Sequence, residues 1–226
     1  MKTAASILAL ALVLAACTAK ENPPAADTTA GTANADPDIN VSGGSIPAGY
    51  TARTDRPDAD ISGAAYTASG GDWEVKTGPA HIVYSANDTA SGTYTVAATI
   101  EQLEKPAHPE AYGLIIGGRN LDQPSQTYTY MLVRGTGDVL IKVREGDQTR
   151  DVIKWTPVAD VPKEDASGKA TYAMTASVTA DAVKFSVNGK EVASVSKAGL
   201  PVDGIAGLRI NHNLHVRATP VSISKP

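Results

Sequence analysis

The sequence predicts an all-β protein in which two antiparallel sheets form a sandwich. Three observations support this prediction. From Trp73 onward, apolar residues recur at every second position in short segments rich in Thr, Val, Tyr and Ile. Gly, Asn, Asp and Pro interrupt these segments about every ten residues. Beyond the N-terminal segment, no stretch combines a helical apolar period with capping residues. About a dozen short strands with this spacing are typical of a sandwich.

Residues 1–16 have the pattern of a secretory signal peptide. Lys2 supplies the positive charge, and the apolar run Ile7–Leu14 is too short to span a bilayer. The tetrapeptide Leu14-Ala15-Ala16-Cys17 resembles the bacterial lipobox, in which the cysteine becomes the acylated first residue of the mature protein. The resemblance implies that Cys17 is a lipidation site. Because Thr18 stands where an aspartate would imply inner-membrane retention, we expect an outer-membrane location in the bacterial cell envelope. An ordinary cleaved signal peptide stays open as the alternative.

Residues 17–47 are predicted to be a flexible tether, because their Ala, Thr, Asn, Asp, Gly and Pro offer too little apolar surface to fold. Residues 48–226 are long enough for one domain with its own core. The only cysteine is Cys17, so the domain offers neither a disulfide nor a cysteine metal site. The net charge is −4 and no basic block occurs, which disfavours nucleic acid and anionic lipid as partners. We expect a monomer that contacts the membrane only through its lipid anchor.

The clearest strand is Gly92–Ile100, in which Tyr94 and every second residue after it share one face. The most specific turn is Asn188-Gly189, which predicts a two-residue type I′ hairpin between Val183–Val187 and Glu191–Val195. The segment Gly135-Thr136-Gly137-Asp138 predicts a second hairpin. The other predicted strands are Ala80–Ser85, Tyr112–Gly118, Gln126–Arg134, Val139–Arg144, Asp151–Trp155, Lys169–Val178, Gly204–Asn211 and Leu214–Ser224.

Four segments resemble the concanavalin A-like lectin/glucanase superfamily. They are YGLIIGGRN (112–120), TYTYMLVRGTGDVLIKVREGD (127–147), VKFSVNGKEVAS (183–194) and GLRINHNLHVRATPVSIS (207–224). The resemblance is greatest to bacterial secreted domains grouped with laminin-G-like and 3-keto-disaccharide hydrolase modules, and it covers about residues 71–224. It implies a two-sheet antiparallel jelly roll. The matching residues specify a turn and a core face, so the resemblance implies the fold more directly than a function.

The glucanases of this superfamily use carboxylates that project from one strand in an E-x-D-x-E pattern. Glu145 and Asp147 have this spacing, but Gly146 lies between them and no third acid follows, so we predict a solvated hairpin tip. Glu164 and Asp165 lie in a segment of loop composition and are predicted to be solvated as well. No nucleophile elbow, metalloprotease motif or P-loop occurs. The sequence therefore names no catalytic residue and no cofactor.

The four histidines do not predict a metal site. His212 and His215 are three residues apart, which places them on opposite faces of a strand unless a turn intervenes. No carboxylate lies near them in the sequence, so we predict a polar turn between the last two strands. His108 lies in a loop-like segment and His81 at the start of a predicted strand.

Aromatic and basic residues on neighbouring predicted strands are the candidates for ligand binding. Tyr128 and Tyr130 share a strand face, and so do Lys142 and Arg144 on the next strand. Such rows would let rings stack on sugar C–H groups and let guanidinium groups bind hydroxyls or carboxylates. Alternatively, and in our view preferably, the tyrosines point with Leu132 into the core. The candidates are Arg119, Arg134, Lys142, Arg144, Trp155, Tyr128 and Tyr130.

The resulting expectation is an envelope-anchored lipoprotein with a non-catalytic sandwich that binds a saccharide or an envelope polymer. Two alternatives stay open. A hydrolase acting on a sugar is compatible with the superfamily resemblance, although such an inference of activity rests on the fold alone. A structural or protein-interaction module is compatible with every observation above. Converging acids in a cleft would favour the enzyme, and exposed aromatic residues would favour the binding protein.

Overall fold

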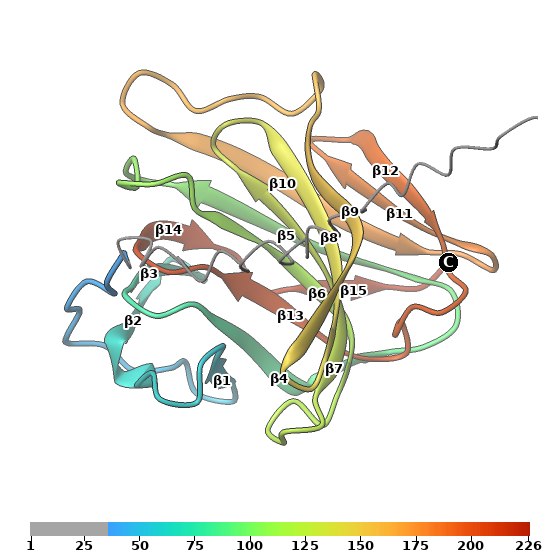
Figure 1. Cartoon of the computed structure of the whole chain (residues 1–226), viewed down its shortest axis with the longest axis horizontal. Helices are drawn as coiled ribbons and strands as arrows, with labels where there is room; N and C mark the ends of the chain where they lie inside the picture. The colour runs from blue at the N-terminus through green and yellow to red at the C-terminus, as the bar shows by residue number, and fades with distance from the viewer. Residues whose placement is uncertain (1–35) are drawn as a thin grey trace, which may run out of the picture. The chain divides into compact units, whose positions relative to one another are not determined.

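The computed structural model describes residues 36–226 (Figure 1). The predicted signal peptide 1–16, the predicted lipidation site Cys17 and the predicted tether up to residue 35 lie outside the described residues. Residues 37–226 form one compact unit, which includes residues 37–47 of the segment that the sequence assigns to the tether. Among the described residues, no helix is both long and apolar enough to cross a membrane.

The unit consists of two antiparallel sheets and one short 3-10 helix, η1 (Ile61–Gly63). One sheet has seven strands. In spatial order these are β1 (Thr51–Thr54), β4 (His81–Ala90), β13 (Gly204–Ile210), β6 (Ala111–Arg119), β7 (Thr127–Arg134), β8 (Asp138–Glu145) and β9 (Gln148–Pro157).

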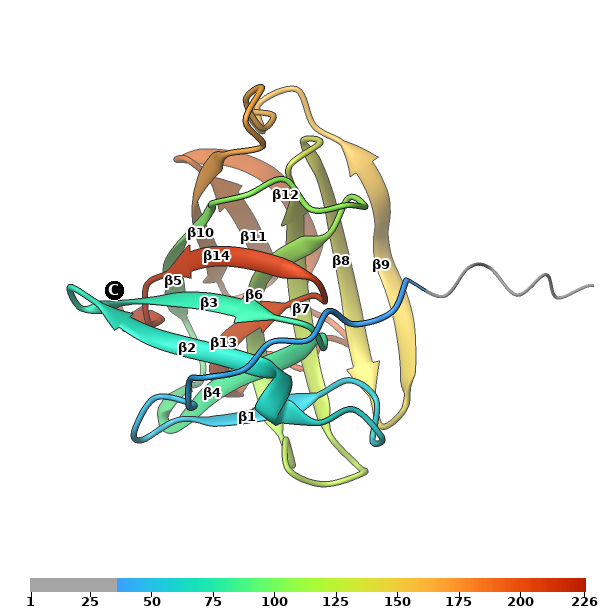
Figure 2. The ribbon, with the colours of Figure 1, turned by 90° about the vertical axis from the view of Figure 1, so that its left-hand side faces the viewer.

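The other sheet has eight strands. In spatial order these are β12 (Lys190–Ser196), β11 (Ala182–Val187), β10 (Ala170–Val178), β5 (Tyr94–Gln102), β14 (Leu214–Ala218), β3 (Asp72–Thr77) and β2 (Ala64–Ser69), while β15 (Ser222–Ser224) also pairs with β5. Figure 2 shows β2, β3 and β14 side by side, in agreement with this order.

Both predicted hairpins are present. Asn188 and Gly189 have φ angles of 50° and 78°, which is the pair of positive values that a type I′ turn requires. The turn after Arg134 likewise joins β7 to β8. Two strand predictions need correction. The predicted strand Leu214–Ser224 is two strands, because Pro220 has no N–H to donate and interrupts the pairing.

The second correction concerns the start of the domain, where strands β1, β2 and β3 were not predicted. The strands β2 and β3 form a hairpin through Gly70 and Gly71, which have φ angles of 62° and 102°. Their short segments, AAYTAS and DWEVKT, contain few large apolar residues, so a period of two is hard to detect there. These strands nevertheless extend one sheet and supply Trp73 to the core.

The main core lies between the two sheets, where alternate side chains of each strand are buried. On β5, Tyr94, Val96, Ala98 and Ile100 are buried and the residues between them are partly exposed, as the sequence predicts. On β6, by contrast, eight consecutive residues from Ala111 are buried. The seven-stranded sheet is therefore covered on its outer face as well as on its inner face.

The strand β9 forms one edge of the seven-stranded sheet and spans ten residues. Its register with β8 shifts on both sides of Ile141. Its first seven residues include Arg150 and Lys154, and its last residue is Pro157. The opposite edge of the same sheet is the four-residue strand β1.

Candidate functional site

The outer face of the seven-stranded sheet collects aromatic and charged side chains from neighbouring strands. Residues paired across antiparallel strands project to the same face, so the register decides which side chains meet. Tyr128 pairs with Arg144, and Tyr130 pairs with Lys142. The aromatic row on β7 therefore lies beside the basic row on β8, as the sequence predicts.

The two tyrosines form the floor of this face. Tyr128 and Tyr130 have exposed fractions of 1% and 5%, and their ring centroids lie 5.6 Å apart. They pack with Leu132 in a second apolar cluster, separate from the cluster between the sheets. Met131, from the alternate positions of β7, belongs to the cluster between the sheets. The tyrosines are thus buried, but on the outer side of their sheet and not in the interior that we favoured.

An ion pair between Arg209 and Asp55 occupies the middle of the face. Arg209 projects from β13 opposite Gly113 of β6, and its Cζ atom lies 5.0 Å from the ring centroid of Tyr130. Its Nη1 atom donates to Oδ1 of Asp55 at 2.6 Å, and its Nη2 atom donates to Oδ2. Burial alone would raise the pKa of Asp55, but Arg209 and Arg144 outweigh it and hold that pKa below its usual value.

The Arg209 guanidinium also has a donor that neither Asp55 nor Tyr128 accepts from. Its Nε atom is buried and has no hydrogen-bond partner among the described residues. A buried donor without a partner costs free energy, so it is rare in folded proteins. The side chain as a whole is held by Asp55 on one side and by the Tyr130 ring on the other.

Beside this ion pair, four predicted residues lie along the outer face of β7, β8 and β9, with Arg134 and Trp155 at one end, Lys142 in the middle and Arg144 at the other end. Arg134 stacks on Trp155, with its Cζ atom 4.0 Å from the ring centroid, and its Nε atom donates to Asp138 at 3.2 Å. Lys142 lies 3.1 Å from Asp151 of β9. Arg134, Lys142 and Trp155 are all partly exposed, so a ligand can reach them.

Arg144 is the fourth residue of this group. Its Nε atom donates to the carbonyl oxygen of Gly146 at 2.8 Å, and its Nη2 atom donates to the carbonyl oxygen of Asp55 at 3.4 Å. We define the β7–β9 patch as Arg134, Lys142, Arg144 and Trp155.

Arg119 does not join this patch. It pairs with Thr127 at the first residue of β7, whereas Arg134 is the last residue of that strand. Its Nε atom donates to the carbonyl oxygen of Asp203 at 3.0 Å. Thr127 projects to the opposite side of β7 from Tyr128 and Arg134, so Arg119 does not share their face and supports a loop next to β13.

A pocket that the sequence did not predict opens at the β1 side of the same face. It has a volume of about 410 Å³ and is lined by Arg53, Tyr84 and Asp122 among others. Arg53 donates from Nη1 to the carbonyl oxygens of Leu121 and Gln123, at 2.9 and 2.5 Å. Burial and the nearby Asp122 raise the pKa of Tyr84, so its hydroxyl stays protonated. The predicted strand Ala80–Ser85 includes Tyr84, but nothing in the sequence marks the short strand β1.

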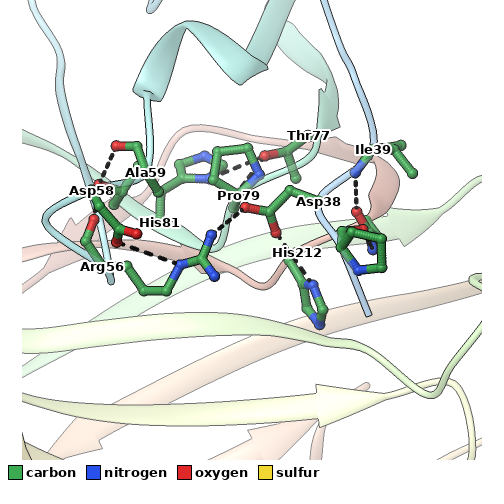
Figure 3. A network of polar contacts seen from close by, with 12 residues as sticks. Asp38, Ile39, Arg56, Asp58, Ala59, Thr77, Pro79, His81 and His212 are labelled. Carbon is green, nitrogen blue, oxygen red and sulfur yellow. Dashed lines mark hydrogen bonds and ion pairs between the residues drawn. The ribbon is translucent and has the colours of Figure 1, made fainter. Parts of the chain in front are cut away.

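The histidines are part of polar networks that span distant segments. Figure 3 shows Arg56 donating to Asp38 at 2.9 Å. Asp38 also contacts Nδ1 of His212 at 3.5 Å, and Nε2 of His212 lies 2.8 Å from Glu110. His212 therefore has carboxylate neighbours, although the sequence has none next to it.

His215 has the same kind of surroundings. Its Nδ1 atom lies 2.8 Å from Glu104 and its Nε2 atom 2.8 Å from Glu74. The two glutamates come from the end of β5 and from β3, far from His215 in the sequence. No carboxylate lies next to His212 or His215 in the sequence, but the fold brings carboxylates to both. The bonds link the imidazole into a surface ion-pair network.

His81 is fully buried against Tyr66 of the cluster between the sheets, and Figure 3 shows its ring beside Pro79 and Thr77. Its Nδ1 atom lies 3.0 Å from the carbonyl oxygen of Pro79, which can only accept, so this nitrogen carries the proton. Its Nε2 atom then accepts from the Tyr66 hydroxyl at 2.6 Å. Burial lowers the pKa of His81 to about 4, because the charged form would lose its hydration.

The carboxylates considered for catalysis lie elsewhere. Glu145 and Asp147 are exposed at the turn between β8 and β9, as the sequence predicts. Glu164 differs from its prediction, because its side chain is only 16% exposed and forms an ion pair with Lys105 at 3.4 Å. It also accepts a hydrogen bond from the buried Gln102 at 2.7 Å. Glu164 therefore binds the loop between β9 and β10 to the end of β5.

No family model matches the chain, and no curated protein is significantly similar to it. Solved structures do match. Carbohydrate binding module CBM66 from Bacillus subtilis superposes with a TM-score of 0.57 and 12% identity, over 83% of this chain and 100% of that module. A protein of unknown function with a galectin-like fold, also from Bacillus subtilis, gives 0.55 and 12%, over 77% and 88%. A GH16 protein of Bacteroides ovatus gives 0.54 and 11%, over 77% and 94%.

The fold is a jelly-roll sandwich. The prediction of an all-β, two-sheet antiparallel, concanavalin A-like sandwich is confirmed by these structures and by the strand pairing. At 11–13% identity, the similarity concerns the fold, and the contacts on the outer face of the seven-stranded sheet have to be interpreted from this chain's own residues.

Proposed function

We propose that this jelly roll binds a saccharide on the outer face of its seven-stranded sheet. One observation carries the proposal. The outer face of the seven-stranded sheet carries the Trp155 ring and three basic side chains on β7 to β9. Toward β1, the same face carries the pocket lined by Tyr84, Arg53 and Asp122. Rings stack on the C–H faces of sugars, and fixed charged groups bind hydroxyls, so this combination suits a carbohydrate.

The similar folds are compatible with this proposal. They include a carbohydrate-binding module and a GH16 protein whose structure is a complex with its product. Binding needs only stacking surfaces and hydrogen-bonding groups, which this face has. Hydrolysis by the glucanase route needs two carboxyl groups about 5 Å apart that reach the same bond. We therefore propose binding, with hydrolysis and a protein-interaction role as the competing hypotheses.

A glycan screen with matched variants tests the proposal. We expect the chain to retain at least one glycan. Trp155→Ala should weaken its binding about tenfold or more, because it removes a partly exposed ring, and Tyr84→Phe should weaken it by removing a hydroxyl at the pocket, each group being worth about 1–3 kcal/mol. Thr175→Ala on the outer face of the other sheet is the control and should bind normally. Absence of any bound glycan, or equal binding by all four proteins, would favour the protein-interaction role.

We also propose that Cys17 carries the lipid that anchors this domain in the bacterial cell envelope, at the outer membrane. The support is the lipobox resemblance of residues 14–17. With acyl chains at about 0.8 kcal/mol per methylene, the lipid alone is sufficient for stable attachment. Cys17→Ser should move the protein from the detergent phase to the aqueous phase in a cloud-point separation. Retention of this variant in the detergent phase would contradict the proposed anchor.

A further inference from the structure

We propose that the saccharide is acidic and that Arg144 binds its carboxylate or sulfate group. This inference rests on the proposed function and adds the chemical class of the ligand. It starts from a difference among the basic residues on the face. Arg134 and Lys142 each have a carboxylate partner, Asp138 at 3.2 Å and Asp151 at 3.1 Å. Within residues 36–226, Arg144 forms no ion pair.

The surroundings of Arg144 are short of negative charge. Asp55 is close enough for Arg144 to lower its pKa, but both oxygens of its carboxylate bind Arg209. Two guanidinium groups therefore share one carboxylate. Among Arg144, Arg209, Asp55, Lys142 and Asp151, this leaves an excess of one positive charge on Arg144. A ligand that carries a negative group would neutralise this excess.

The donors of Arg144 are also incompletely used. Its Nε atom has a good hydrogen bond at 2.8 Å, but the bond from Nη2 to Asp55 is long at 3.4 Å. No described residue accepts a hydrogen bond from Nη1. A guanidinium binds a carboxylate or sulfate through two parallel N–H donors, and such charge-assisted bonds are about twice as strong as neutral ones. The Nη1 donors of Arg144 are therefore free to bind a ligand, and its side chain is partly exposed.

Arg144 is held by its hydrogen bond to Gly146 and lies next to the Arg209–Asp55 pair. Asp55 is fixed by two bonds from Arg209, and its carbonyl oxygen is an acceptor for Arg144. Trp155 projects from β9, the strand next to β8, and belongs to the same face. Thr156 pairs with Val139 and Thr149 with Arg144, so Trp155 and Arg144 lie about 13 Å apart along β8. An oligosaccharide with one ring on Trp155 and an anionic substituent on a further ring at Arg144 spans this distance. Arg209 is a positioning residue in this arrangement, because its own guanidinium is covered.

The net charge of the chain excludes a general attraction between a basic protein and an acidic polymer. At −4, the protein as a whole repels an anion, so attraction has to come from the local excess at this face. We therefore expect a weak dependence on salt, close to that of one ionic contact, in place of the steep dependence of a polycation.

Isothermal titration with matched ligands tests the inference. The probes are an acidic oligosaccharide that the screen identifies and its neutral counterpart, made by carboxyl reduction for a uronate or by desulfation for a sulfated glycan. We expect the acidic form to bind at least tenfold more tightly. Arg144→Gln should remove this preference and leave the affinity for the neutral form unchanged, whereas Arg144→Lys should restore part of it. Lys184→Gln, on the other sheet, is the control.

The outcomes separate the inference from the proposed function. If neutral glycans bind as tightly as acidic ones, or if Arg144→Gln keeps the preference, the acidic class is wrong and saccharide binding stands. If the screen finds no glycan of either class, both proposals fail. Inorganic sulfate and acetate, titrated in the same way, show whether the anionic group alone is sufficient, and tight binding of either ion would contradict recognition of a saccharide.

Discussion

The two outer faces of this sandwich differ in composition, although both belong to sheets that share one core. The face of the seven-stranded sheet carries tyrosines, a tryptophan and ion pairs in a second apolar cluster. The face of the eight-stranded sheet carries small side chains that are partly exposed, among them Thr95, Ala97, Thr99, Thr175, Ser177 and Ser186. The comparison shows that buried contacts are concentrated on the outer face of the seven-stranded sheet, where we propose that the ligand binds, while the other outer face is a solvated surface.

The ion pairs of the two faces show the same contrast. Arg209 and Asp55 have side chains only 8% and 23% exposed, whereas Arg217 and Glu101 on the eight-stranded sheet are 38% and 33% exposed. In water, an ion pair competes with hydration and contributes little. In a buried site, the loss of one partner leaves a charge without compensation.

The largest expected effect therefore comes from Asp55→Asn. Neutralising this carboxylate leaves Arg209 buried and charged, which should cost about 3 kcal/mol of unfolding free energy. Glu101→Gln removes the equivalent partner of Arg217 on the other face and should cost less than about 1 kcal/mol. Urea denaturation at pH 7 measures both. Equal losses would show that the two faces do not differ in the way described.

The second effect is the pH dependence of stability that arises from His81. Its folded pKa is about 4, while the unfolded value is about 6.5. Between these values the unfolded chain binds a proton that the folded chain does not, so stability decreases as the pH falls through this window. The expected loss between pH 7 and pH 4.5 is about 2 kcal/mol.

Urea denaturation of two variants at pH 7 and at pH 4.5 shows whether His81 causes this loss of unfolding free energy. His81→Gln should flatten the dependence, whereas Tyr66→Phe keeps the imidazole and should retain it. The lowered pKa of Asp55 acts below this window, since its contribution is lost only as the pH falls below the usual carboxyl value of about 4. An unchanged slope in His81→Gln would show that another group titrates.

A smaller effect is expected from Gly189→Val in the hairpin of the eight-stranded sheet. A Cβ atom at this position meets no neighbour within 4 Å, so the cost comes only from the φ angle of 78°. We expect a loss of about 1 kcal/mol or more in thermal or urea unfolding. Ser194→Val, on a strand of the same hairpin, is the control and should be nearly neutral. A neutral Gly189→Val would mean that the turn is not type I′.

The smallest effect is expected on the outer face of the eight-stranded sheet itself. Thr175→Ala should change the unfolding free energy by less than about 0.5 kcal/mol, because a partly exposed threonine contributes little packing. Thermal unfolding measures this change. A loss above 1 kcal/mol would show that this face, too, has structural contacts beyond those of its strands.

The sequence predicts which residues share a face, but it does not show which side of a sheet that face covers. The alternation places Tyr128 and Tyr130 together, and the register confirms it. Whether they point into the sandwich or away from it depends on the packing of Met131 and its neighbours against the other sheet. Both faces of β7 are apolar, so the pattern contains no information about direction.

The partners in the candidate site come from positions that are distant in the sequence. Asp55 and Arg209 are 154 residues apart, and His215 is 141 residues from Glu74. No spacing rule predicts such pairs, because they arise only when the last strands return beside the first ones. The pocket at β1 was missed for the same reason. Its strand has only four residues, and its aspartate, Asp122, lies in a loop.

The exposed edge strand β9 has a consequence for proteins crowded on a surface. An unpaired edge invites a second chain to add a strand, and copies held on one membrane by the proposed lipid anchor would meet edge to edge. The shifts of register beside Ile141, the charges of Arg150 and Lys154, and the closing Pro157 all oppose such pairing. The strand that presents Trp155 is thereby protected against intermolecular aggregation while its outer side chains stay accessible.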